Sequence, residues 1–195
     1  MNSEKVGKLI YQLRKEKKLT QKQLADIINV SDKAISKWER GAGCPDITLL
    51  NQLSKALNIS IDRILDGELD LNKIDSGNIN KIRFYVCPNC SNIITATSAT
   101  SITCCGRPLK ALKAKASDLE HHLNIEEIED DFYITFSHEM SKSHYINFIA
   151  YVTSDRVFLV RLYPEQASGV RFAKMYGGTF YFSCNRDGLW VQKDE

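Results

Sequence analysis

The chain has 195 residues, 43% of them hydrophobic, which is enough for one or two domains with packed cores. Its net charge of +2 is too small to identify a nucleic-acid-binding protein. The charge is uneven, because residues 1–66 carry 12 Lys and Arg against 8 Asp and Glu, whereas residues 67–195 carry 14 against 16. No apolar run approaches the roughly 18 residues of a membrane span, so none is predicted.

Residues 1–18 have the pattern of an amphipathic helix and lack the apolar centre of a signal peptide. We therefore expect a cytoplasmic protein, a compartment in which thiols stay reduced. Six cysteines in such a chain indicate metal ligands before disulfides.

Five short helices are predicted within residues 1–66, and the two between residues 20 and 40 are the most sharply defined. Thr20 and Gln23 have the spacing of a capping box at the start of one helix. Asn29 tolerates the left-handed conformation that ends this helix, and Ser31 can cap the next one. Beyond them, Pro45 and Asp46 are expected to open a fourth helix, and Asn58 to close it.

The run T-Q-x-x-L-A…V-S…A-I-S-x-W-E-R-G closely matches the phage-repressor (Xre) family, and residues 4–66 as a whole resemble its helix-turn-helix domain. The resemblance implies a five-helix domain that binds double-stranded DNA, usually as a homodimer on two half-sites. It places residues 31–40 in the major groove, where each base pair is distinct. It also implies an internal pair between Arg14 and Glu39.

Candidate DNA contacts follow from the family motif and from the basic or polar residues near the two helix N-termini. They are Gln21, Lys22, Ser31, Asp32, Lys33, Ser36, Lys37 and Arg40. For each lysine, a solvated surface charge is an equal alternative to a base contact. Asp32 can accept from cytosine or can simply favour the helix N-terminus.

Residues 66–80 are rich in Asp, Asn, Gly and Ser and have no periodicity, which predicts a linker. Cys87-Pro-Asn-Cys90 then precedes Cys104-Cys105-Gly106 by thirteen residues. Two such pairs can complete a tetrahedron of thiolates around zinc or iron. The alternatives are two disulfides or four unconnected thiols. The pattern resembles the desulforedoxin module, although the segment between the pairs is shorter and lacks glycines, so iron and zinc both stay open.

Short β-prone runs separated by turn signals follow and predict a β-sandwich. They are residues 132–136, 145–153, 157–162, 170–172 and 179–183. Residues 112–123 are expected to be a connector, and the acidic run Glu126–Asp131 a solvated turn.

All four histidines of the chain lie beyond residue 120. The words S-H-E-M-S-K-S-H-Y-I-N-F-I and C-N-R-D-G-L-W resemble the catalytic domain of superoxide reductase (neelaredoxin, desulfoferrodoxin). The resemblance implies an immunoglobulin-like β-sandwich that holds iron through four histidines and one thiolate. Carried over by motif, the ligands are His121, His138, His144 and Cys184, with His122 as the alternative to its neighbour.

Two departures from this pattern bear on the chemistry. Asp187 stands where the fourth histidine is expected, and Glu120 where a lysine precedes the first histidine. Asp187 can still ligate, because iron and zinc both accept a carboxylate and a carboxylate can favour zinc, or it can point away and leave three histidines and a thiolate. For the site as a whole, iron is expected before zinc. Glu120 would repel an anionic substrate. We therefore expect metal binding to persist rather than efficient superoxide reduction, and we assign no catalytic residue.

The sequence thus predicts a multidomain α + β protein. Its expected parts are an Xre-type helix-turn-helix domain (1–66), a linker (67–82), a desulforedoxin-like or zinc-ribbon-like tetrathiolate knuckle (83–110) and an immunoglobulin-like β-sandwich (118–195). The predicted function is a DNA-binding transcription regulator with a metal-binding, redox- or superoxide-sensing C-terminal region. The alternatives are a superoxide reductase carrying a DNA-binding domain, and metal sites that only stabilise a dimerisation module.

Overall fold

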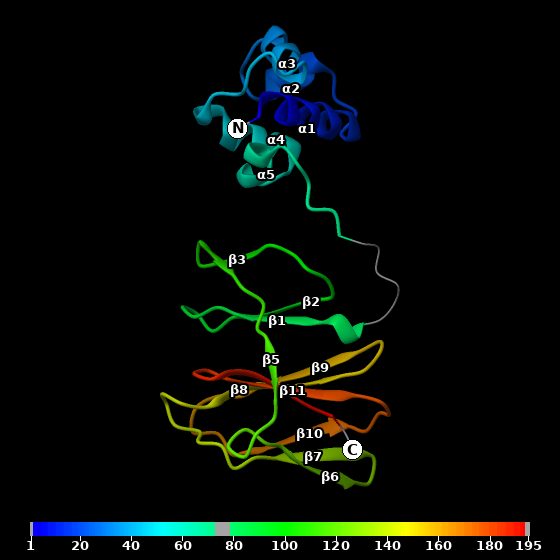
Figure 1. Ribbon diagram of the computed structural model, residues 1–195, viewed down its shortest axis with the longest axis vertical. Coiled ribbons are helices and arrows are strands. Elements are labelled where there is room, and N and C mark those ends of the chain that lie inside the picture. Colours follow the sequence, from blue (N-terminus) through cyan, green and yellow to red (C-terminus); the bar gives the residue numbers. More distant parts are fainter. Residues whose placement is uncertain (1, 73–78, 194–195) are drawn as a thin grey trace. The chain divides into compact units, whose positions relative to one another are not determined.

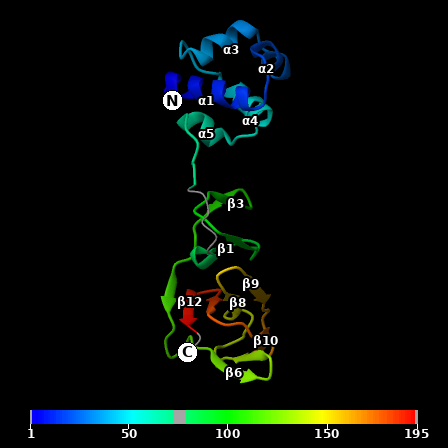
Figure 2. The ribbon, with the colours of Figure 1, turned by 90° about the vertical axis from the view of Figure 1, so that its right-hand side faces the viewer.

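The computed structural model describes residues 2–72 and 79–193. The chain forms two compact units, Met1–Leu71 (the helical unit) and Asn72–Glu195 (the β unit). The first contains the α-helices and the second the β-strands (Figures 1 and 2). The predicted linker includes residues 73–78, which lie outside the described residues. In the described part of the chain no helix is both long and apolar enough to cross a membrane.

The helical unit contains the five predicted α-helices: α1 (Ser3–Glu16), α2 (Gln21–Ile27), α3 (Asp32–Glu39), α4 (Leu50–Leu57) and α5 (Ile61–Asp66). The capping box of Thr20 and Gln23 is present, and the Ser31 side chain accepts from the Ala34 backbone N–H. Asn29 has the predicted left-handed conformation, with φ of 55°. The fourth helix does not open at Pro45, because Asp46 instead caps a short 3-10 helix, η1 (Ile47–Leu49), that precedes α4.

Helices α1 and α3 approach closely in the core of the helical unit. A Cβ added at Gly7 of α1 would lie 2.1 Å from the carbonyl oxygen of Trp38, so only glycine fits there. The predicted pair is confirmed: Arg14 Nε lies 2.5 Å and Arg14 Nη2 2.8 Å from the two carboxylate oxygens of Glu39. Gln21 Nε2 also donates to Glu39, at 2.7 Å. These contacts join α1, α2 and α3 beneath the exposed face of α3.

The β unit begins with η2 (Ile79–Lys81) and two small hairpins. Strand β1 (Arg83–Val86) pairs antiparallel with β2 (Ile93–Ala96), and β3 (Ile102–Cys104) with β4 (Arg107–Leu109). Each of the two predicted cysteine pairs lies at a hairpin: Cys87 directly follows β1, and Cys104 ends β3.

Two sheets, antiparallel except for one pair of strands, face each other in the remainder, which confirms the predicted β-sandwich. One sheet has the order β10 (Gly169–Ala173), β7 (Asp131–Thr135), β6 (Asn124–Ile128). The other has the order β5 (Ala114–Ala116), β12 (Gly188–Lys193), β11 (Thr179–Cys184), β8 (Ile146–Val152), β9 (Val157–Arg161), in which only β5 pairs in parallel. Aromatic side chains such as Phe132, Tyr151 and Phe180 fill the space between the sheets.

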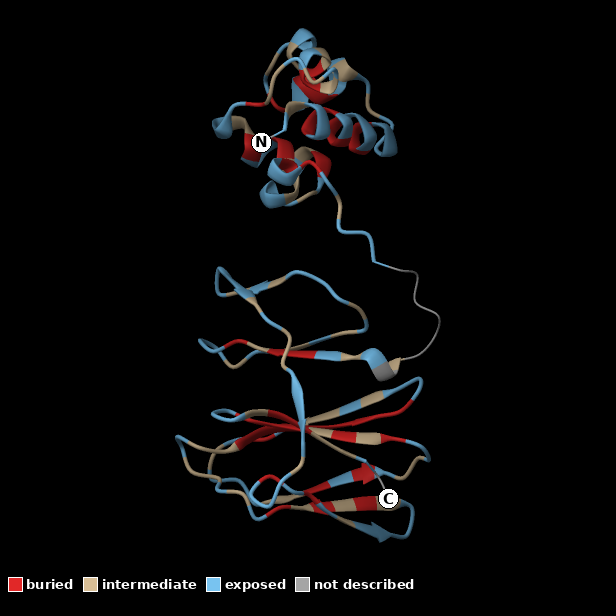
Figure 3. Ribbon diagram, viewed as in Figure 1, coloured by how far each residue is buried: buried red, intermediate tan, exposed pale blue. Residues whose placement is uncertain are grey.

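All seven residues of β8 are buried, on both faces of the sheet (Figure 3). The inner face contributes Ile149 and Tyr151 to the core between the sheets. The outer face is covered by β1, whose Phe84 stacks on Phe148 with ring centroids 5.2 Å apart. A strand covered on both faces loses the alternation of a half-exposed strand, which explains the continuous run INFIAYV.

Within the described sandwich, three strands were not predicted: β5, β6 and β12. The expected connector, residues 112–123, contains β5, and β12 occupies the end of the C-N-R-D-G-L-W word. The expected acidic turn is also partly wrong, because Glu126 and Glu127 lie in β6 and only the residues around Glu129 (φ 56°) make a turn. All three residues of β5 and four of the five in β6 are exposed. Their side chains are therefore mostly polar or small, and carry no apolar alternation to detect.

Candidate DNA-binding surface and metal sites

The outward face of α3 carries the residues predicted to contact DNA. Buried Ile35 and Trp38 hold the inner face of this helix. The candidates Lys22, Ser31, Asp32, Lys33, Lys37 and Arg40 are exposed, and Gln21 and Ser36 are half-buried. The structure thus leaves a charged helix face available to a groove.

Four of these candidates have side-chain partners within the domain, one of them Ser31 through its cap on the Ala34 N–H. The amide of Gln21 donates to Glu39, which leaves its carbonyl oxygen available. Arg40 Nε donates to the Ser36 carbonyl at 3.1 Å. Asp32 Oδ1 accepts from the Lys33 backbone N–H at 2.8 Å, a contact that stabilises the N-terminus of α3.

A surface hollow beside the start of α2 adds basic residues that sequence reasoning missed. Lys15, Lys18 and Lys22 line it, together with Thr20 and Asp32. The lysine run at the end of the first helix was the available signal, but only the fold brings it next to Lys22. Such a cluster is suited to phosphate contacts.

Four cysteine sulfurs converge between the two small hairpins, a cluster named here the thiolate site. Its members are Cys87, Cys90, Cys104 and Cys105, whose sulfurs all lie within 4.8 Å of one another. All four are free thiols, and the 3.6 Å between the sulfurs of Cys90 and Cys104 is far beyond a disulfide bond. Cys105 and Gly106 both have positive φ, 51° and 73°, which lets adjacent cysteines turn back toward the first pair.

The thiolate site has the electrostatics of a cation-binding centre. Backbone N–H groups of Cys90 and Asn89 lower the pKa of the Cys87 thiol to about 7. Hydrogen bonds with Cys90 and Cys87 raise the pKa of the Cys105 thiol to about 12. One sulfur is therefore easily ionised while a neighbour resists ionisation, and a divalent cation at the centre would stabilise all the thiolates together.

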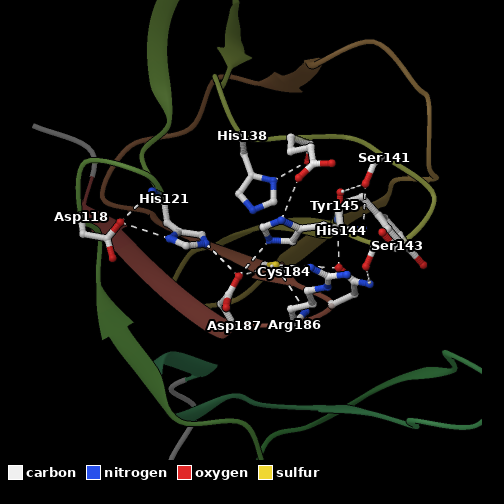
Figure 4. Close-up of polar contacts among 12 residues, drawn as sticks. Asp118, His121, His138, Ser141, Ser143, His144, Tyr145, Cys184, Arg186 and Asp187 are labelled. Atoms are coloured by element: carbon white, nitrogen blue, oxygen red, sulfur yellow. Dashed lines mark hydrogen bonds and ion pairs between the residues drawn. The ribbon is translucent and has the colours of Figure 1, made fainter.

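Five side chains from separate parts of the sandwich converge in a second cluster, the His/Cys/Asp site (Figure 4). It contains His121, His138, His144, Cys184 and Asp187, whose ligand atoms all lie within 4.8 Å of one another. His121 precedes β6, His138 follows β7, His144 precedes β8, Cys184 ends β11, and Asp187 lies in the turn before β12. His122 and Glu120 are exposed and lie outside this cluster.

Each histidine is held through Nδ1, so that Nε2 points into the site. His121 Nδ1 lies 3.1 Å from Asp118 Oδ1, and His144 Nδ1 lies 3.1 Å from Glu139 Oε2. His138 Nδ1 lies 2.5 Å from the Glu139 carbonyl oxygen. Carboxylates and carbonyls only accept, so Nδ1 is the donor in these three contacts, and a metal ion would be bound through Nε2. This is the arrangement that orients metal-binding histidines.

Asp187 occupies the middle of the cluster. Its Oδ2 lies 2.9 Å from His144 Nε2, 3.2 Å from Cys184 Sγ and 3.5 Å from His121 Nε2. The hydrogen bond from Cys184, followed by that from His144, lowers the pKa of Asp187, so its carboxylate is charged. Burial raises the pKa of Cys184 and lowers that of His138, which keeps this imidazole neutral.

The donor set fits a metal ion. His121 Nε2 and His138 Nε2 are buried and make no hydrogen bond, although unpaired buried nitrogens are costly. Cys184 is 3% exposed, whereas the Asp187 side chain is 43% exposed, so the site is deep at the sulfur and open at the carboxylate. Nitrogen, sulfur and oxygen donors of this kind suit iron or zinc.

Comparisons with known proteins divide the chain in the same way as its fold. Residues 10–64 match the helix-turn-helix family model. The transcriptional activator BcrR of Enterococcus faecalis is 42% identical over 80 residues, 40% of this chain and 39% of BcrR, so the chain spans about two fifths of the length of that relative. A desulfoferrodoxin of Clostridium acetobutylicum is 25% identical over 119 residues, 57% of this chain and 95% of that protein.

The chain joins a helix-turn-helix domain to a desulfoferrodoxin-like region. A crystal structure of the superoxide reductase from Treponema pallidum covers 57% of this chain and 98% of its own, with a TM-score of 0.50 and 20% identity. This likeness shows the fold of the desulfoferrodoxin-like region. Both predicted resemblances are therefore confirmed.

Proposed function

We propose that this protein is a sequence-specific DNA-binding transcription regulator whose desulfoferrodoxin-like region binds metal and senses iron, superoxide or redox state. The observation that carries the proposal is the His/Cys/Asp site, with five ligand atoms within 4.8 Å, on the same chain as a helix-turn-helix domain. A regulator needs an input and an output. The metal site supplies the input, and the helix-turn-helix domain supplies the output.

On the output side, α3 enters the major groove of double-stranded DNA. Lys33 and Lys37 are exposed on this helix and suit guanine acceptors. Lys15, Lys18 and Lys22 line the hollow beside it and suit phosphates. Because one such helix reads only a few base pairs, a homodimer on two half-sites about one helical turn apart supplies the specificity.

On the input side, the thiolate site holds iron or zinc, and the His/Cys/Asp site holds iron rather than zinc. Asp187 and Cys184 together bring two negative charges that balance a divalent ion. Bound iron supplies one-electron redox chemistry, and an extra anionic ligand lowers its reduction potential. The exposed Asp187 edge gives oxidants access to the site.

The test compares DNA affinity in three states of the protein. Protein purified without oxygen is analysed for metal, then divided into loaded, chelator-treated and oxidised portions. Each is titrated, by fluorescence anisotropy, onto a duplex selected from a random DNA library. We expect affinities that differ at least tenfold between states, and a His138→Ala variant that no longer responds. Equal affinities in all three states would contradict sensing while leaving DNA binding intact, and the metal sites would then be structural.

A second candidate, a superoxide reductase that carries a DNA-binding domain, is favoured by the match over 95% of the desulfoferrodoxin. Two residues argue against this candidate. The Asp187 carboxylate lies at the centre of the site, and Glu120 adds a negative charge next to His121. Superoxide consumption by the iron-loaded protein at the rate of buffer would eliminate this candidate. Turnover gained by an Asp187→His variant would identify the carboxylate as the cause.

A further inference from the structure

Lys115 lies on β5, the three-residue strand at the edge of the larger sheet. It stands opposite Trp190 in the parallel pairing of β5 with β12. All three side chains of β5 are exposed, so burial of apolar area does not explain why this strand adheres. Besides its backbone pairing with β12, the strand is held by side-chain contacts, and Lys115 makes two of them.

The ammonium group of Lys115 bridges two parts of the His/Cys/Asp site. Its Nζ donates to the backbone carbonyl of Asp187 at 2.9 Å. The same Nζ lies 5.1 Å from the ring centroid of Trp190, within the range of a cation–π contact. Trp190 in turn stacks on His121, with centroids 3.7 Å apart and planes 7° from parallel.

The turn that carries Asp187 is fixed at both of its ends. At the first, Asn185 Oδ1 accepts from the Tyr145 backbone N–H at 2.9 Å, and Asn185 Nδ2 donates to the Ser143 carbonyl at 3.0 Å. At the second, Lys115 holds the Asp187 carbonyl. The next residue is Gly188, with φ of 103°. Because glycine has no Cβ, steric contacts do not hold its backbone in one conformation. Without Lys115, the Asp187 carbonyl loses its side-chain donor, and the segment between Asn185 and the Cys184–Gly188 strand pair can reorient the Asp187 carboxylate.

We propose that Lys115 is a positioning residue of the His/Cys/Asp site, which aims the Asp187 carboxylate at the metal and holds Trp190 against His121. The inference rests on the proposed metal binding. It assigns a role in that site to a residue from the segment that joins the thiolate knuckle to the sandwich. Loss of an outer contact of this kind typically weakens metal binding about 10–100-fold.

In the first test, metal-free protein is titrated with Co²⁺, and binding is monitored by the quenching of Trp190 fluorescence. Lys115→Met keeps the aliphatic chain and removes the charge and the donor, so we expect binding at least tenfold weaker. Lys115→Arg keeps the cation and is expected to recover most of the affinity. Lys113→Met removes an equally exposed charge from the same segment and is the matched control. In a Cys184→Ser background, thiolate-to-cobalt absorption comes from the thiolate site alone, and it is expected to stay unchanged by Lys115→Met.

A double-mutant comparison separates positioning from general stability. If Lys115 acts through Asp187, Lys115→Met should cost less than threefold in an Asp187→Ala background. A full tenfold loss there would mean that the lysine acts elsewhere, and the proposal would be overturned. Equal Co²⁺ affinity of wild type and Lys115→Met would also overturn it, while the proposed metal binding would stand.

The second test needs no metal and holds even if wild-type protein fails to bind Co²⁺ at this site, which would refute the proposed function itself. Trp190 is 2% exposed, and the other tryptophan, Trp38, is the same background in every variant. Acrylamide quenching of Trp190 should increase at least twofold in Lys115→Met and stay constant in Lys113→Met. Unchanged quenching in Lys115→Met would contradict the positioning role.

Discussion

Lys37 lies in the last turn of α3, where its aliphatic chain rests beside Gly43 while the residue stays exposed. We predict that Lys37→Ala weakens binding to the selected duplex by about 1–3 kcal/mol, because it removes a donor to base or phosphate. Lys55→Ala, an exposed change on α4, is the control and should leave affinity unchanged. Anisotropy titrations at fixed salt give both values, and equal affinities for the two variants would remove Lys37 from the interface.

Arg14 and Glu39 form a buried ion pair, and the stability of the helical unit should be sensitive to the loss of either partner. Their side chains are 6% and 4% exposed, and Glu39 also accepts from Gln21. Glu39→Ala leaves the Arg14 charge buried without its partner, so we predict a loss of about 3–5 kcal/mol in the free energy of unfolding. Urea denaturation measures it. Lys5→Ala, which breaks the exposed Lys5–Glu68 pair, should cost about 1 kcal/mol or less.

The residues of the His/Cys/Asp site differ in how well the sequence alone predicts their positions. Neighbours in an extended segment point to opposite sides, so one of His121 and His122 is expected to face inward, and the motif favours His121. The structure buries His121 and exposes His122. Asp187 stands out in a motif only as a departure, and its central position depends on His121 and His144, which come from other segments. Lys115 has no local signal, because its partners lie 72 and 75 positions away.

Among the elements, β1 packs onto the sandwich through Phe84. Phe84 is 1% exposed and stacks on Phe148, so it anchors the first hairpin to the outer face of β8. We predict that Phe84→Ala destabilises the β unit by about 3–5 kcal/mol, as expected for a deleted core aromatic. Thermal unfolding followed by circular dichroism measures the change. Phe158→Ala on β9, where the ring is 37% exposed, should cost clearly less, and equal costs would mean that Phe84 is no anchor.

Elements with a distinct apolar pattern could be predicted from the sequence, and those without it could not. The helices of residues 1–66 have apolar stripes and capping residues, and β7 through β11 are runs of β-branched and aromatic residues. Strands β5 and β6 are largely exposed edge strands, so Lys115 and Glu126 there are indistinguishable from loop residues. Strand β12 was not predicted because its first residues belong to the C-N-R-D-G-L-W motif, which was interpreted as part of a metal site.

At the scale of the molecule, metal removal should affect the two units differently. Strands β3 and β4 contain no buried side chain, so their hairpin depends on the thiolate site, whereas α1–α5 share an apolar core. We predict that a strong chelator raises amide hydrogen exchange in residues 87–109 at least tenfold and leaves residues 10–64 unchanged. Mass spectrometry of peptides from both regions measures this. Unchanged exchange in residues 87–109 would show that the knuckle folds without metal.

Strand β8 is covered on both faces, and this affects how the chain folds during its synthesis. The helical unit has all its helices by residue 66, so it can fold early in synthesis. Strand β1 emerges next, yet the sheet it covers does not exist until β8, β11 and β12 have been made. During that interval Phe84 has no partner and β8 is exposed on both faces. A nascent chain of this protein is therefore most prone to aggregation, and most dependent on chaperones, between residues 84 and 193.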